Sequence, residues 1–271
     1  MGVLPVDVHP SEVGLDATRL GRVADFARAF VDDGHMVGTD VLVARHGRVV
    51  LRSTSGLADR ENSVPVADDT LWRIFSMTKP ITSVAVMQLV EEGRLRLRDP
   101  VSGVLPEFAD PRVFVGGTAD VPEVVPADRP ITIADLLSHT SGLSYSILDQ
   151  HPVDEMYRRA GLATLERGGT LADTISRLAA LPLRHQPGTR WSYSMATDVL
   201  GRVVEVLDDR PFADCLAERV LQPLGMHDTS FRVPDERVDR LSSCYGFAPG
   251  AAPALVDSGP TSAFREALVG P

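Results

Sequence analysis

Apolar positions in the first 60 residues are spaced in two different ways. Between residues 11 and 31 they recur as on one face of a helix, which predicts an amphipathic helix there. Between residues 39 and 59 two apolar runs, 41–43 and 49–51, flank the tripeptide His-Gly-Arg. Because glycine permits a tight turn between two such runs, this segment is predicted to form a β-hairpin.

The segment 77–92 is apolar almost all the way round a helix, which is typical of a helix inside a molecule rather than on its surface. Pro80 must lie in or near the first turn, since deeper in the helix it would remove a backbone hydrogen bond and clash with the preceding turn. The helix is therefore expected to begin close to Ser76.

The middle of the chain changes from loop to helix. Pro, Gly and Asp are frequent from about 100 to 130, which predicts a loop with short helical turns. Thr132 and Thr170 each stand three residues before an aspartate, a spacing that predicts the start of a helix. The helix after Thr170 must stop before Pro182.

Two further helices are predicted, one from about 195 to 207 and one beginning at Pro211. The organisation is therefore a β-hairpin part, a mainly helical part and a short tail. A two-stranded hairpin is marginal alone, so more strands are needed. Few strand candidates are visible between 235 and 271.

Composition and charge exclude several classes of function. The chain is 44% hydrophobic and 24% charged, like ordinary globular proteins, and its net charge of -10 disfavours nucleic acid as a partner. No apolar run could span a membrane, and the N-terminal residues lack the features of a signal peptide, so a cytoplasmic location is expected.

Cys215 and Cys244 could form a bridge, but two buried thiols are favoured. The seven histidines show no metal-ligand spacing, and no metal or cofactor is expected.

Ser76 and Lys79 form the first chemically suggestive pair. Residues three apart on a helix are neighbours, so the Lys79 ammonium can reach the Ser76 hydroxyl. A helix start favours developing negative charge, and burial is expected to lower the lysine pKa, which would make a neutral lysine a competent base. An activated serine nucleophile needs these features.

Tyr193 is the second candidate. It lies between a Pro-Gly turn and a predicted helix that Ser194 could cap. Its hydroxyl could point into a cleft, where a nearby ammonium would favour a phenolate or a proton shuttle. Packing of the aromatic ring under a loop is the alternative for Tyr193 alone.

Four segments in order carry a resemblance to a known family. They are SMTK at 76–79, ITIADLLSHTSGL at 131–143, WSYSMATDVLGRVVE at 191–205 and LQPLGMHDTSF at 221–231. Together they resemble the family VIII carboxylesterases, relatives of class C β-lactamases and penicillin-binding DD-peptidases. The resemblance covers roughly residues 11–250. It implies a β-lactamase/transpeptidase-like fold of the α/β plus all-α class, with an antiparallel sheet flanked by helices, a helical domain, and the site between the two domains.

The resemblance also implies roles for individual residues. Ser76 would be the nucleophile, Lys79 the residue that activates it, and Tyr193 the base and proton shuttle. His139, in the second segment, is interpreted as a structural loop residue. Where the lactamases and peptidases carry an asparagine that helps hold the substrate amide, this chain has Met195, which cannot donate or accept comparable hydrogen bonds. Met195 therefore favours an ester, whose leaving group needs less protonation than that of an amide.

A third family motif, Lys-Thr-Gly or His/Trp-x-Gly on a late strand, has no counterpart before Pro271. In the family that strand supplies one of two oxyanion-hole N–H groups, and losing such a donor costs about 10²- to 10³-fold in rate. We therefore expect either a fragment or one piece of a protein completed by a second chain. The expected domains are 1–105 (the N-terminal part of the α/β domain), 106–232 (mainly helical) and 233–271 (a segment returning to the α/β domain).

The sequence thus favours a serine hydrolase that cleaves a small-molecule ester through an acyl-Ser76 intermediate. Enzymatic alternatives are a β-lactamase or DD-peptidase and an acyltransferase that uses the same intermediate. An alternative of another class is a non-catalytic fragment or binding module on the same scaffold, which the missing third motif supports. The regions 106–130 and 144–170 are expected to shape the pocket.

Overall fold

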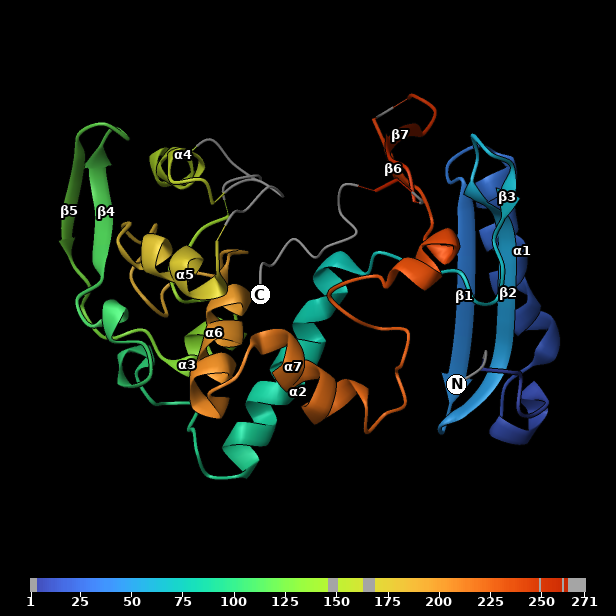
Figure 1. The fold of residues 1–271 in the computed structure, drawn as a ribbon, viewed down its shortest axis with the longest axis horizontal. Coiled ribbons are helices and arrows are strands. Elements are labelled where there is room, and N and C mark those ends of the chain that lie inside the picture. Colours follow the sequence, from blue (N-terminus) through green and yellow to red (C-terminus); the bar gives the residue numbers. More distant parts are fainter. Residues whose placement is uncertain (1–3, 146–150, 163–168, 249, 260, 263–271) are drawn as a thin grey trace. The chain divides into compact units, whose positions relative to one another are not determined.

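The computed structural model describes residues 4–145, 151–162, 169–248, 250–259 and 261–262. These residues form two compact units (Figure 1). One contains the chain up to Ile74 and again from Arg232, and the other contains Phe75–Phe231. This division differs from the boundaries expected after residues 105 and 232, which stay a prediction.

The first unit is built on an antiparallel sheet with the strand order β1-β2-β3. In Figure 1 helix α1 runs along this sheet, and it packs against β1 and β2. A separate hairpin is formed by β6 and β7. The elements are α1 (Ala17–Asp32), β1 (Gly38–Arg45), β2 (Arg48–Asp59), β3 (Val64–Pro65), β6 (Cys244–Gly246) and β7 (Ala254–Asp257).

The predicted hairpin is confirmed, because β1 and β2 are joined by a two-residue turn. His46 and Gly47 have φ angles of 52° and 73°, the left-handed values that a tight hairpin turn of this kind requires. The preceding helix begins later than predicted. A 3-10 turn over Pro10–Val13 ends at Gly14, and α1 starts only after Asp16, whose side chain accepts a hydrogen bond from the Arg19 N–H at 2.8 Å.

In the tail, where the sequence shows few strand candidates, the described residues contain the paired strands β6 and β7. Both strands are very short, so neither shows an alternating pattern long enough to be recognised. Both cysteines are free thiols, as expected. Cys215 is buried, whereas Cys244 is only half-buried.

The second unit is mainly helical and holds the larger apolar core. Buried side chains of α2, α3, α5 and α6, such as Leu89, Leu136, Ile175 and Val203, meet in one cluster. Figure 1 shows α2, α6 and α7 side by side, and α2 contacts both other helices. The elements are α2 (Thr78–Glu91), β4 (Arg112–Gly117), β5 (Pro122–Pro126), α3 (Ile133–Leu137), α4 (Pro152–Arg159), α5 (Leu171–Ala179), α6 (Ala196–Asp208) and α7 (Phe212–Leu216).

Helix starts in this unit agree with the sequence. The Thr132 and Thr170 side chains each accept a hydrogen bond from the N–H of the aspartate three residues later, and each aspartate carboxylate accepts one from the backbone N–H of its threonine. Helix α5 ends before Pro182, and α7 follows Pro211 as expected. These helix starts are confirmed. They could be predicted because a capping box involves only residues close together in the sequence.

Two expectations for this unit are corrected. The region from 100 to 130 has the predicted helical turns, at Val101–Gly103 and Pro106–Phe108, but it also contains the β4–β5 hairpin. Helix α2 is not buried all the way round, since Val84 and Met87 are 47% and 43% exposed. An apolar side chain on a helix therefore did not guarantee burial here.

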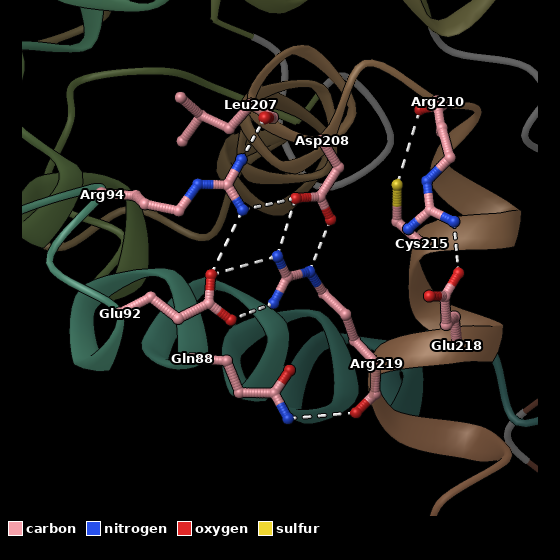
Figure 2. Close-up of polar contacts among 9 residues, drawn as sticks. All are labelled: Gln88, Glu92, Arg94, Leu207, Asp208, Arg210, Cys215, Glu218 and Arg219. Atoms are coloured by element: carbon pink, nitrogen blue, oxygen red, sulfur yellow. Dashed lines mark hydrogen bonds and ion pairs between the residues drawn. The ribbon is translucent and has the colours of Figure 1, made fainter.

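An ion-pair cluster joins the ends of α2 and α6 to the π-helical segment Ala217–Leu221 that follows α7 (Figure 2). The Asp208 carboxylate, only 4% exposed, accepts from the Arg219 guanidinium at 2.5 and 2.7 Å and from Arg94 at 2.8 Å. Glu92 receives further hydrogen bonds from both arginines. These hydrogen bonds hold the pKa of Asp208 at about 2, despite its burial, so the carboxylate stays charged.

Within the described part of the chain, no helix has both the length and the apolar character needed to cross a bilayer.

Candidate active site

Ser76 and Lys79 lie together at the start of α2. Ser76 is in a 3-10 turn over Phe75–Met77, and Lys79 is the second residue of the helix. The Lys79 Nζ donates a hydrogen bond to the Ser76 Oγ at 3.1 Å. The three-residue spacing thus produces the contact expected from helix geometry. Ser76 is exposed, so a substrate can approach its hydroxyl.

Tyr193 reaches the same serine from a distant part of the sequence. Its segment directly precedes α6, and its Oη lies 2.7 Å from the Ser76 Oγ although the two residues are 117 positions apart. The Lys79 Nζ lies 4.7 Å from the centre of the Tyr193 ring. The structure therefore brings all three predicted site residues into direct contact.

The surroundings of Tyr193 favour its charged form. Burial raises the pKa of the phenol, but the hydrogen bonds with Lys79 and Ser76 and the positive charge of Lys79 outweigh burial. The more distant charge of Asp198 opposes them weakly. The net result is a pKa below the usual 10.0, which makes Tyr193 a better proton acceptor near neutral pH.

Two aromatic neighbours of Tyr193 were not recognised as site residues from the sequence. The His139 ring lies with its centre 5.0 Å from that of Tyr193, tilted by 36°. The Tyr145 ring meets Tyr193 edge-on, with centres 5.7 Å apart. The sequence predicts only a structural loop role for His139, and its place in the 131–143 segment is the one signal of proximity to the site.

Ser194 and Met195 correct one detail of the local prediction. Ser194 does not cap α6, because its buried hydroxyl bonds with the His139 Nδ1 at 3.1 Å and the helix N-cap is Met195. The Met195 side chain is fully buried in the apolar core, and its N–H donates to the Ser144 carbonyl at 3.1 Å. The position at which the resemblance expects an amide is thus occupied by a core side chain.

The backbone at two site positions is in a conformation that side chains rarely adopt. Phe75, next to Ser76, has a φ of 41°, and His139 has a φ of 56°. Left-handed conformations cost a non-glycine residue about 1–3 kcal/mol and concentrate at functional sites. The two strained residues lie next to the proposed nucleophile and against Tyr193, which supports a functional role for this region.

Large apolar side chains stand exposed beside the predicted residues. Phe75 and Met77 flank Ser76 in sequence and are 53% and 68% exposed, and Trp191, two residues before Tyr193, is 64% exposed. The Trp191 ring also packs edge-on against His139. Such exposed apolar groups are suited to contact an apolar ligand.

The arrangement combines a nucleophile, a cation and a proton acceptor. Ser76 can attack an acyl carbon, Tyr193 can take its proton, and Lys79 can stabilise the negative charge that develops on either oxygen. No group of three or more His, Cys, Asp or Glu side chains that could hold a metal ion occurs among the described residues.

Comparisons with known proteins agree on one family. The family model described as "Beta-lactamase" matches residues 23–266. Among curated proteins, Esterase EstB of Burkholderia gladioli is 42% identical over 83% of this chain and 55% of its own length. Lovastatin esterase of Penicillium rubens is 35% identical over 86% of this chain and 58% of its own length.

Solved structures with the same fold include two enzymes. EstCE1, described as a hydrolase with promiscuous acyltransferase activity, superposes with a TM-score of 0.76 at 37% identity, covering 89% of this chain and 59% of its own. Simvastatin synthase of Aspergillus terreus superposes with a TM-score of 0.73 at 27% identity, covering 90% of this chain and 61% of its own. The predicted fold class is therefore confirmed. The chain spans slightly more than half the length of these two curated relatives.

Proposed function

Because this chain belongs to the beta-lactamase family, in which its similar curated relatives include esterases, we propose that it carries the nucleophile and base of a carboxylesterase. The observation that carries the proposal is the contact set of Ser76, Lys79 and Tyr193, with Tyr193 Oη 2.7 Å and Lys79 Nζ 3.1 Å from the Ser76 Oγ. Because the match covers 55% of the length of Esterase EstB, the activity is proposed for the whole protein.

Acylation starts from the Ser76 hydroxyl. Tyr193, as phenolate, removes the proton while the Ser76 Oγ attacks the ester carbonyl carbon, and the phenol then gives this proton to the departing alkoxide. The Lys79 ammonium holds the phenolate before the attack, which is consistent with the lowered pKa of Tyr193. An acyl-Ser76 ester and a free alcohol result.

Deacylation reverses the same steps with a different nucleophile. Water gives a proton to Tyr193 and attacks the acyl carbon, and Ser76 leaves with its proton restored. If an alcohol replaces water, a new ester forms and the enzyme is an acyltransferase. The description of EstCE1 as a hydrolase with promiscuous acyltransferase activity supports this second candidate.

Two features favour an apolar ester over a β-lactam or a peptide. Met195 is buried in the core and presents no amide to a substrate. The exposed side chains of Phe75, Met77 and Trp191 could contact an apolar acyl or alcohol group. Nitrocefin should therefore be turned over far more slowly than p-nitrophenyl acetate.

Active-site labelling tests the proposal. In the whole protein a fluorophosphonate should attach to Ser76, and Ser76→Ala should abolish both the label and the hydrolysis of p-nitrophenyl esters. Ester hydrolysis that persists unchanged in Ser76→Ala would instead favour a non-catalytic scaffold with a contaminating esterase. An added alcohol that diverts the acyl group into a new ester would support the acyltransferase.

A further inference from the structure

His139 is attached to the Tyr193 segment on both sides of the tyrosine. Its carbonyl accepts the N–H of Ser192 at 2.8 Å, and its Nδ1 bonds with the hydroxyl of Ser194 at 3.1 Å. The residue before Tyr193 and the residue after it are thus both fixed to His139. A loop histidine whose only role is to end α3 would need neither contact.

The ring of His139 then limits where the Tyr193 ring can go. The two rings are 5.0 Å apart at a tilt of 36°, Tyr145 meets Tyr193 edge-on at 5.7 Å, and the Lys79 Nζ is 4.7 Å from the phenol ring. With His139, Tyr145 and Lys79 around it, Tyr193 is held in the position that brings its hydroxyl to the Ser76 Oγ.

The charge state of His139 fits this role. Burial lowers its pKa, and the positive charge of Lys79 lowers it further, so the ring is neutral at physiological pH. A neutral ring can pack on Tyr193 without adding a second cation beside Lys79. A charged His139 would compete with Lys79 for the phenolate.

The backbone of His139 carries a cost that this role explains. Its φ of 56° lies in the left-handed region, which costs a non-glycine residue about 1–3 kcal/mol. The contacts of the ring with Tyr193 and Ser194 offset this cost.

We propose that His139 is a positioning residue whose ring holds the Tyr193 phenol against Ser76 and Lys79. This inference rests on the proposed function for its catalytic meaning, but its structural content concerns Tyr193 alone. It goes beyond the nucleophile, the activating lysine and the tyrosine, since His139 itself contacts no reacting atom.

The test reads the Tyr193 phenol directly. The protein is labelled with ¹³C at the tyrosine ζ carbon, the Tyr193 signal is assigned with Tyr193→Phe, and its pH titration is followed by NMR. His139→Asn removes the ring but suits the left-handed backbone. In this variant the midpoint of the Tyr193 titration should rise to the ordinary value of about 10, because the contacts with Lys79 and Ser76 that lower it are lost. His185→Asn, a change at another half-buried histidine of the same unit, should leave the midpoint unchanged.

Kinetics supply the second readout. With p-nitrophenyl acetate, His139→Asn should lower kcat about 10- to 100-fold with little change in KM, the size expected for a misplaced catalytic group. In a Tyr193→Phe background the same change should have little further effect, because His139 acts through Tyr193. A purely structural role would instead lower activity by the same factor in both backgrounds.

The outcomes separate this inference from the proposed function. An unchanged Tyr193 midpoint in His139→Asn, or losses that multiply in the double variant, would overturn it. If His139→Asn does not fold, His139→Phe keeps a ring and should retain the low midpoint, and a folded Phe variant with a midpoint near 10 would also overturn it. A protein without a label on Ser76 would refute the esterase, while the Tyr193 titration would still decide the role of His139.

Discussion

Replacing Asp208 by alanine should destabilise the helical unit more than any exposed ion pair could. Asp208 is 4% exposed and receives hydrogen bonds from Arg94 and Arg219 (Figure 2). In Asp208→Ala both arginines keep Glu92 as a partner, so neither is left without a carboxylate. The loss should therefore be smaller than the full cost of an unpaired buried charge, which is about 3–5 kcal/mol.

The pKa of Asp208 gives the size of its contribution to the free energy of unfolding. It falls from 3.8 to about 2, mainly because of the hydrogen bond from Arg219 and in spite of burial. A shift of one pKa unit corresponds to about 1.4 kcal/mol, so ionised Asp208 contributes about 2–3 kcal/mol at pH 7. Since the folded-state pKa is the lower one, this contribution is complete above about pH 5, falls to about half at pH 3 and disappears below pH 2.

Urea unfolding followed by circular dichroism checks this reasoning. The unfolding free energy of Asp208→Ala should lie about 2–3 kcal/mol below that of the unchanged protein at pH 7, and the difference should shrink by about half at pH 3. The matched control is Glu218→Ala, which breaks the exposed pair with Arg210 and should cause no measurable shift. Equal effects of the two variants, or a difference for Asp208→Ala that does not change with pH, would refute the reasoning.

Three further predictions concern the catalytic role of Tyr193, the pH dependence of activity and the turn at Gly142. Tyr193→Phe should lower kcat for a p-nitrophenyl ester by about 10²- to 10⁴-fold with little change in KM, as loss of a general base does, whereas Tyr145→Phe should cost less than about 10-fold. Because the pKa of Tyr193 is lowered, kcat/KM should rise with pH and level off below pH 10, a rise that a pH profile of Tyr193→Phe should lack. Gly142→Ala should lower the urea midpoint of unfolding clearly more than Gly34→Ala. Both glycines have a positive φ, but only at Gly142 would the new Cβ meet another atom, the His185 carbonyl oxygen at 2.1 Å. Equal shifts for the two glycine variants would contradict that steric argument.

Much of the fold could be predicted where local chemistry decides it. The starts of α3 and α5 follow from Thr132 and Thr170, since a capping box involves residues only three apart. The β1–β2 hairpin follows from the turn at Gly47. The β4–β5 hairpin was missed because its strands are rich in the Pro and Gly residues that usually indicate loops, as Gly116 and Pro122 illustrate.

The sequence alone placed some residues in the candidate site but not others. Ser76 and Lys79 are neighbours through helix geometry alone, so their contact follows from spacing. Tyr193 is 117 residues away from Ser76, and only the resemblance to a family placed it in the site. His139 could not be assigned a role from the sequence, because its importance lies in contacts with Ser192 and Ser194 that depend on tertiary packing.

Trapping the acyl-enzyme tests the central claim most directly. The whole protein is mixed with p-nitrophenyl acetate, quenched in acid within the first turnovers, digested and analysed by mass spectrometry. We expect one acetyl group on the peptide that contains Ser76, and none in Ser76→Ala. Continued ester turnover with no acetyl group on Ser76, or with the group on another residue, would contradict the account.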